Sequence, residues 1–229
     1  MIFTDAVFRA VAGGADPSNI FLCSNFYTPK PTAEHNWYLS QMVRRLAQLT
    51  KTFETPIIVG KDSSSGTYIE QDEERIDVPY TFALYAGGIV PDVGNVITQD
   101  FKKSGSKIVV AGPLGNHQTQ KLFLKYLFNL YQRSDNPILS ASTIGEGGLI
   151  RTLFEMCYGG DMGAYLNLHH FGNISREDIL FAEQLGGQVA DQLGAGAVAL
   201  DPCREQLTRR TATAKRCEQA PQKPLYLRL

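Results

Sequence analysis

Hydrophobic residues recur at helical spacing in several stretches of the chain. In 33–53 they fall every three or four positions, with arginine and glutamine between them: Leu39, Met42, Val43, Leu46, Leu49 and Phe53. This spacing predicts an amphipathic helix, because such residues line one face at 3.6 residues per turn. Shorter patterns of the same kind predict helices over 4–11, around 122–130 and directly after Gly148.

Short apolar runs between these helices have the length of β-strands. They lie at 19–23, 56–59, 80–90, 107–111 and 138–144. The first sixty residues thus read helix, strand, helix, strand, a pattern that places strands side by side under helices. The charged stretch 70–77 predicts an exposed hairpin tip.

The whole pattern predicts a mixed fold class, α/β to α+β. We expect a partial N-terminal-type sheet domain over 1–112 and a partial C-terminal-type α/β domain over 113–187, divided at the glycines around 112–115. The range 188–229 is rich in alanine, glycine and basic residues and lacks apolar periodicity. It predicts a disordered tail.

The strongest candidate for chemistry is Gly60-Lys61-Asp62-Ser63, which follows the apolar run 56–59. A glycine turn at the carboxyl end of a strand offers backbone amides, a cation and hydroxyls to a phosphate. Ligands of α/β sheets lie at this end of their strands. An ordinary surface turn has the same composition, and this alternative stays open.

A second candidate precedes the helix that starts after Gly148. Gly145-Glu146-Gly147-Gly148 leaves amides free at a helix start, where an anion can dock, and we expect Gly147 and Gly148 to supply them. A tight glycine turn is the alternative. We expect this stretch and the one at Lys61 to converge on a single anion pocket.

Composition and charge limit the classes of partner that the chain is expected to bind. The formal net charge of -1 favours neither nucleic acid nor an anionic membrane. No apolar run approaches the roughly 18 residues that span a bilayer, and the first residues lack a secretory pattern, so we expect a cytoplasmic protein. The four cysteines form no Cys-x-x-Cys pair for zinc or redox chemistry.

Several motifs follow one another in an order that resembles a known family. They are Ala12-Gly13-Gly14-Ala15-Asp16-Pro17, Ser24-Asn25-Phe26, Gly60-Lys61-Asp62-Ser63, Val90-Pro91-Asp92-Val93, Gly147-Gly148-Leu149 with Leu153-Phe154-Glu155-Met156, and Phe181-Ala182-Glu183-Gln184-Leu185-Gly186. Together they resemble the second half of the synthetase region of phosphoribosylformylglycinamidine synthase, in the aminoimidazole ribonucleotide synthetase-like superfamily. The likeness covers about residues 5–187.

This resemblance implies the superfamily's fold, incomplete at both ends, and an ATP-dependent ligase of purine biosynthesis that converts formylglycinamide ribonucleotide to its amidine. ATP and magnesium would be its cofactors. The chain lacks the family's His-Asn-His-Pro segment and a glutaminase. Its partners would therefore be the missing first half of the synthetase, a glutaminase domain or subunit, and the ribonucleotide substrate. We expect the isolated chain to be inactive and its exposed sheet edge to favour a homo-oligomer.

The resemblance also assigns roles to single residues. It implies that Gly60 contacts nucleotide and Ser63 contacts substrate, with Asn25 and Asp62 in the same group. Lys61 stands where the small form of the enzyme has a magnesium-binding asparagine, and we hypothesise that its charge replaces the metal against phosphate.

The family's Asp-x-Ser-Asp segment, which supplies metal and nucleotide ligands, is replaced here by Thr143-Ile144-Gly145-Glu146. Only Glu146 keeps a carboxylate, which makes it the candidate magnesium ligand.

Two alternative functions and one hypothesis about the reading frame stay open. The chain could be a non-catalytic structural or auxiliary nucleotide-binding module of the same superfamily, or an unrelated ribonucleotide-binding regulator that has kept the fold. The likeness stops near residue 187, which also suggests a shift of the reading frame there.

Overall fold

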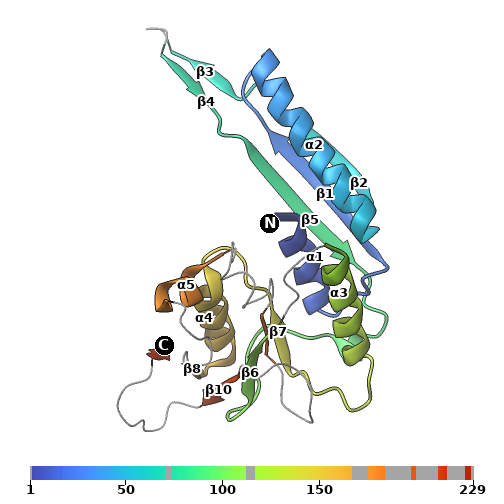
Figure 1. The fold of residues 1–229 in the computed structure, drawn as a ribbon, viewed down its shortest axis with the longest axis vertical. Helices are drawn as coiled ribbons and strands as arrows, with labels where there is room; N and C mark the ends of the chain where they lie inside the picture. Colours follow the sequence, from blue (N-terminus) through green and yellow to red (C-terminus); the bar gives the residue numbers. More distant parts are fainter. Residues whose placement is uncertain are drawn as a thin grey trace.

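The computed structural model describes residues 2–70, 74–111, 117–166, 175–183, 197–199, 211–215 and 225–227. Figure 1 shows a narrow upper lobe of helix and sheet above a broader lower lobe. The chain begins with α1 (Ile2–Ala12), β1 (Ile20–Tyr27), α2 (Ala33–Phe53) and β2 (Ile57–Ser63). This is the predicted order of helix, strand, helix, strand.

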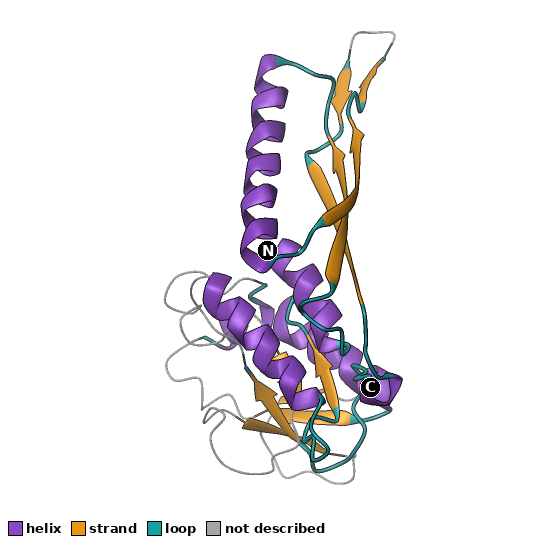
Figure 2. Ribbon diagram, turned by 90° about the vertical axis from the view of Figure 1, so that its right-hand side faces the viewer, coloured by secondary structure: helices purple, strands orange, loops and turns teal. Residues whose placement is uncertain are grey.

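The upper lobe contains a three-stranded sheet in the order β2-β1-β5, with β5 spanning Thr81–Gly88. β1 runs parallel to β2 and antiparallel to β5. α2 covers one face of this sheet, and among the described residues no helix lies on the opposite face (Figure 2). That opposite face is called the open face below.

α2 has the bounds that its apolar pattern predicts. It begins after Thr32, whose side chain accepts a hydrogen bond from the backbone amide of His35. It ends at Glu54, which takes a left-handed conformation with φ 59°. Leu46, Leu49 and Phe53 are buried against the sheet.

A two-stranded hairpin extends the upper lobe at its far end (Figure 1). It consists of β3 (Thr67–Ile69) and β4 (Arg75–Asp77). This confirms the hairpin predicted from the charged stretch 70–77.

The lower lobe follows. Its elements are η1 (Val93–Asn95), β6 (Lys107–Val110), α3 (His117–Tyr131), β7 (Ser140–Ser142), α4 (Gly148–Gly160), β8 (Gly163–Leu166), α5 (Arg176–Phe181), β9 (Ala197–Ala199), β10 (Thr211–Lys215) and β11 (Leu225–Leu227). The strands form a six-stranded sheet in the order β11-β8-β10-β6-β9-β7. In 188–229, where the sequence predicts disorder, the described residues are β9, β10 and β11; the rest of that range lies outside the description.

Two hydrophobic cores stabilise the fold. The first contains residues of α1, β1 and α2 together with residues of α3 and β7, so it is shared by both lobes. In it the buried Tyr131 hydroxyl donates a hydrogen bond to the Ala12 carbonyl, 3.2 Å away. The second core lies between β6, α4, β8 and α5. No helix among the described residues is both long enough and apolar enough to span a membrane.

Candidate functional site

The stretch Gly60–Ser63 is part of a strand and not the turn that its composition predicts. β2 continues to Ser63 because residues 60–63 pair in parallel with residues 24–27 of β1. β1 likewise extends beyond the predicted 19–23. The prediction of a turn at Gly60 was therefore wrong, since this backbone contributes to the ladder between the two strands.

Strand geometry divides the predicted site residues between two faces. Residues that alternate along a strand point to opposite sides, so Lys61 and Ser63 share one face with Asn25, while Gly60 and Asp62 share the other. A Cβ on Gly60 would lie 3.5 Å from the hydroxyl oxygen of Ser24, which is buried on the α2 side. Lys61, Ser63 and Asn25 consequently belong to the open face.

Asn25, Lys61 and Ser63 form the open-face group. The Ser63 hydroxyl donates a hydrogen bond to the Asn25 side-chain oxygen at 3.3 Å. Asn25 is the register partner of Lys61. The Lys61 side chain is exposed and forms no hydrogen bond or ion pair with the described residues. The group thus presents one free cation beside an amide and a hydroxyl.

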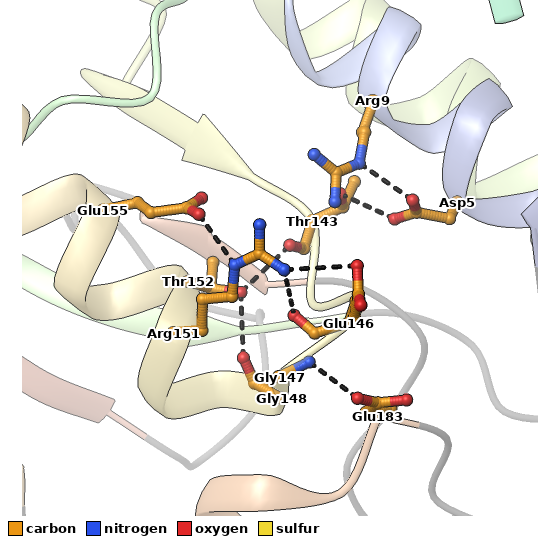
Figure 3. A network of polar contacts seen from close by, with 10 residues as sticks. All are labelled: Asp5, Arg9, Thr143, Glu146, Gly147, Gly148, Arg151, Thr152, Glu155 and Glu183. Atoms are coloured by element: carbon orange, nitrogen blue, oxygen red, sulfur yellow. Dashed lines mark hydrogen bonds and ion pairs between the residues drawn. The ribbon is translucent and has the colours of Figure 1, made fainter.

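The second predicted site lies at the start of α4 (Figure 3). Gly147 caps the helix with φ 79°, and Gly148 follows with φ 72°. The Gly147 amide donates to the Glu183 carboxylate at 2.9 Å, and the Gly148 amide donates to the Gly145 carbonyl at 3.0 Å. The two amides that the sequence predicts for an external anion are therefore bonded within the chain.

Glu146, the candidate metal ligand, extends into solvent with 83% of its side chain exposed. Its carboxylate lies 3.4 Å from an Arg151 nitrogen, and Arg151 also forms an ion pair with Glu155 at 2.9 Å. The hydrogen bond and charge of Glu155, with a smaller contribution from Glu146, raise the pKa of the Arg151 guanidinium. Arg151 is thus already paired with Glu146.

Magnesium needs several hard oxygen ligands at about 2.1 Å. Within the described ranges, no three His, Cys, Asp or Glu side chains gather in a way that could hold a metal ion. Thr143, which the resemblance places where the family has an aspartate, offers an uncharged hydroxyl that faces Asp5. The residues present around 143–146 do not fit a magnesium ion.

α1 contacts the segment before α4 through a polar network that the sequence did not suggest (Figure 3). The Thr143 hydroxyl donates to the Asp5 carboxylate at 3.2 Å, and Arg9 forms an ion pair with the same carboxylate at 2.9 Å. A Cβ on Gly145 would lie 2.8 Å from Asp5 Oδ1 and 3.0 Å from an Arg9 nitrogen. Only the i,i+4 spacing of Asp5 and Arg9 was visible in the sequence.

Replacing Thr143 by valine is expected to lower the free energy of unfolding by about 1 kcal/mol, because the Asp5 carboxylate loses the buried Thr143 hydroxyl as a donor while the side-chain shape is kept. Urea unfolding followed by circular dichroism measures this. In the Asp5→Ala background the same substitution should cost clearly less. An equal cost in both backgrounds would show that the hydrogen bond contributes nothing.

The two predicted stretches do not meet. β2 belongs to the upper lobe and α4 to the lower lobe (Figure 1). Within the part of the chain that the structure describes, no hydrogen bond or ion pair joins the open-face group to residues 143–148. The single anion pocket expected from the sequence is replaced by two separate polar groups.

Comparisons with known proteins identify the class of fold. The structure of PurLQS from Thermotoga maritima matches with a TM-score of 0.60 at 16% identity, covering 86% of this chain and 32% of that chain. T. maritima PurL complexed with ATP matches with a TM-score of 0.51 at 12% identity, covering 84% and 30%. The chain therefore has the AIR synthase-like fold.

Sequence comparison is more specific. The family model described as AIR synthase related protein, C-terminal domain, matches residues 92–218, which is more than half of the chain. The chain belongs to this family. It is 26% identical over 202 residues to the phosphoribosylformylglycinamidine synthase subunit PurL of Pelagibacter ubique, a match that covers 79% of this chain and 27% of the relative. The chain thus spans about a quarter of that protein's length.

The family match also bears on two expectations. It continues to residue 218 and therefore passes residue 187, where the sequence suggested a frame shift. This extent weighs against a shifted frame. It also runs across both predicted domain boundaries, which remain predictions.

Proposed function

We propose that this chain forms one part of an ATP-dependent phosphoribosylformylglycinamidine synthase, in which its open-face group lines a nucleotide or ribonucleotide site. The resemblance to PurL in sequence and fold supports the relation of this chain to that enzyme. The missing first half of the synthetase and a glutaminase would complete the active enzyme, which would work in the cytoplasm. The isolated chain would be inactive because it lacks the His-Asn-His-Pro segment in which the resemblance places the catalytic histidine.

The open-face group is the observation that carries this proposal. It lies towards the carboxyl ends of the parallel strands β1 and β2, where ligands of such sheets bind. Lys61 is exposed and has no partner among the described residues, so its charge is available to a phosphate. β2 is an edge strand, so another polypeptide, or a second copy of this chain, can approach this side.

ATP enters the proposal through the relatives. T. maritima PurL has been solved with ATP bound. In our chain Lys61 would supply the positive charge next to the phosphates, with Ser63 and Asn25 as hydrogen-bonding neighbours. Since the residues around Glu146 do not fit magnesium, no magnesium ligand is assigned to this chain.

Replacing Lys61 by alanine is expected to weaken ATP binding about tenfold in the mixture of this chain with the PurL first half and glutaminase of its own organism, because a charged hydrogen bond contributes about 1.5 kcal/mol. Isothermal titration calorimetry measures the change. Lys51→Ala, which removes another exposed lysine at the last turn of α2, is the matched control and should leave affinity unchanged. Equal affinities of both variants would exclude a role for Lys61.

A non-catalytic or auxiliary nucleotide-binding module is the second candidate. The internally bonded segment 143–148 favours it, because that segment occupies the place of the family's metal and nucleotide ligands. The same titration separates the two functions. Binding of ATP only in the mixture supports a part of a ligase, whereas tight binding by the chain alone supports an auxiliary module.

A further inference from the structure

We infer that residues 143–148 of this chain, together with Asp5, Arg9, Arg151 and Glu183, form a closed structural joint between α1, α4 and the end of α5, and do not receive a magnesium–nucleotide complex. We call this set the α1–α4 joint. The inference goes beyond the proposed function, since it concerns the segment that the proposed site does not use.

The start of α4 is closed first. The unpaired amides at a helix start attract anions because they carry the positive end of the helix dipole. Here the carboxylate of Glu183 accepts from Gly147, and the Gly145 carbonyl accepts from Gly148. The chain's own groups therefore satisfy the Gly147 and Gly148 amides, the two that the sequence predicts for an external anion.

Backbone packing closes the same place sterically. Gly148 approaches the end of α5 so closely that a Cβ on it would lie 2.6 Å from the Leu180 carbonyl oxygen. Leu180 is itself buried in the second core. The helix start is thus packed against protein on the side where α5 ends.

Charge closes the joint against a metal ion. Arg151 lies between Glu146 and Glu155 and forms ion pairs with both. Arg9 contributes a second guanidinium on the α1 side, where it pairs with Asp5. A divalent cation at Glu146 would have to displace a guanidinium from the only carboxylate in 143–148.

The remaining polar groups of the segment are used in holding it in place. The Thr143 hydroxyl donates to Asp5, and the Thr152 hydroxyl lies 3.1 Å from the Thr143 carbonyl. The Asp5–Arg9 pair occupies the space in which a Cβ on Gly145 would lie. Thr143 and Gly145, which stand at two ligand positions of the family's Asp-x-Ser-Asp segment, thus face α1, and Glu146 at the third is exposed and paired with Arg151.

Hydrogen exchange read by mass spectrometry on the full chain tests the inference. The Glu183→Ala variant should exchange about fivefold faster than the unaltered chain in peptides covering 145–152, because the Gly147 amide loses its acceptor. Glu177→Ala, on the neighbouring first turn of α5, is the matched control and should leave these peptides unchanged. The Glu183 side chain is exposed, so its loss leaves both cores intact.

The second arm uses the unaltered chain with magnesium chloride alone and with magnesium plus ATP. Exchange in 145–152 should stay the same in both. Protection there by either addition, or equal exchange in the Glu183→Ala and Glu177→Ala variants, would overturn the inference. Protection by ATP confined to 57–63 would show that the chain alone binds nucleotide at the open-face group, which favours the auxiliary module. Unchanged exchange in 57–63 is the result expected of a part that binds ATP only in the mixture. Both results leave the joint closed.

Discussion

Alanine at Gly148 is expected to lower the free energy of unfolding by about 3 kcal/mol or more. Two costs add at this position. Alanine would have to hold φ 72°, in the left-handed region that side chains avoid. Its Cβ would also lie 2.6 Å from the Leu180 carbonyl oxygen and 2.7 Å from the Phe181 carbonyl carbon, both of which belong to backbone that cannot rotate away. Urea unfolding of the variant measures the loss.

Gly105 offers a matched control for this substitution. It has φ 87°, but a Cβ added to it would meet nothing within 4 Å. Gly105→Ala should therefore show the backbone cost alone, about 1 kcal/mol. The difference between the two variants isolates the contact of α4 with α5. If both variants lose the same stability, that contact is looser than the structure shows.

Truncation of Leu22 to alanine is expected to lower the free energy of unfolding by about 3 kcal/mol, within the range for buried leucine. Leu22 lies in β1, the central strand of the upper sheet, with 0% of its surface exposed, in the core shared by α1, α2 and α3. Its removal leaves a cavity under the sheet that holds Asn25 and Lys61. Thermal and urea unfolding both report the effect.

Val59 is the control for Leu22. It lies on the neighbouring strand β2, with 57% of its surface exposed on the open face. Val59→Ala should change stability by no more than about 0.5 kcal/mol. A loss at Val59 comparable to that at Leu22 would mean that the open face is covered in solution, for example by a second copy of the chain.

Much of the fold was predictable because its signals are local. The bounds of α2 follow from apolar spacing and a threonine cap, and α1 follows from Val7, Phe8 and Val11. Ser175 caps α5 through its hydroxyl, which accepts from the Asp178 amide at 3.0 Å. Each of these features depends on residues within one or two turns of one another.

The end of β2 was missed because a distant strand decides it. Gly60 and its polar neighbours have the composition of a turn, yet pairing with residues 24–27 of β1 extends the strand to Ser63. The same pairing moves Asp62 away from Lys61. Asn25 and residues 60–63 were therefore predicted as one set, whereas the division of that set between two faces of the sheet was not.

The hydrogen bonds that occupy the start of α4 could not be predicted from the sequence either. Glu183 is 36 positions from Gly147, and Asp5 is 138 positions from Thr143. Neither partner carries a local signal for its role. A glycine-rich helix start indicates free amides only if the folded chain does not place one of its own carboxylates against them.

The shared core has a consequence for dividing the protein. α1 packs on β5 and also on α3 and β7, so apolar contacts run without interruption past residue 112. Two pieces separated there would each expose surface that the intact chain buries, on α1 and β5 in one and on α3 in the other. Such pieces should behave as complementing fragments, in which the hydroxyl of Tyr131 finds the carbonyl of Ala12 again only after reassembly.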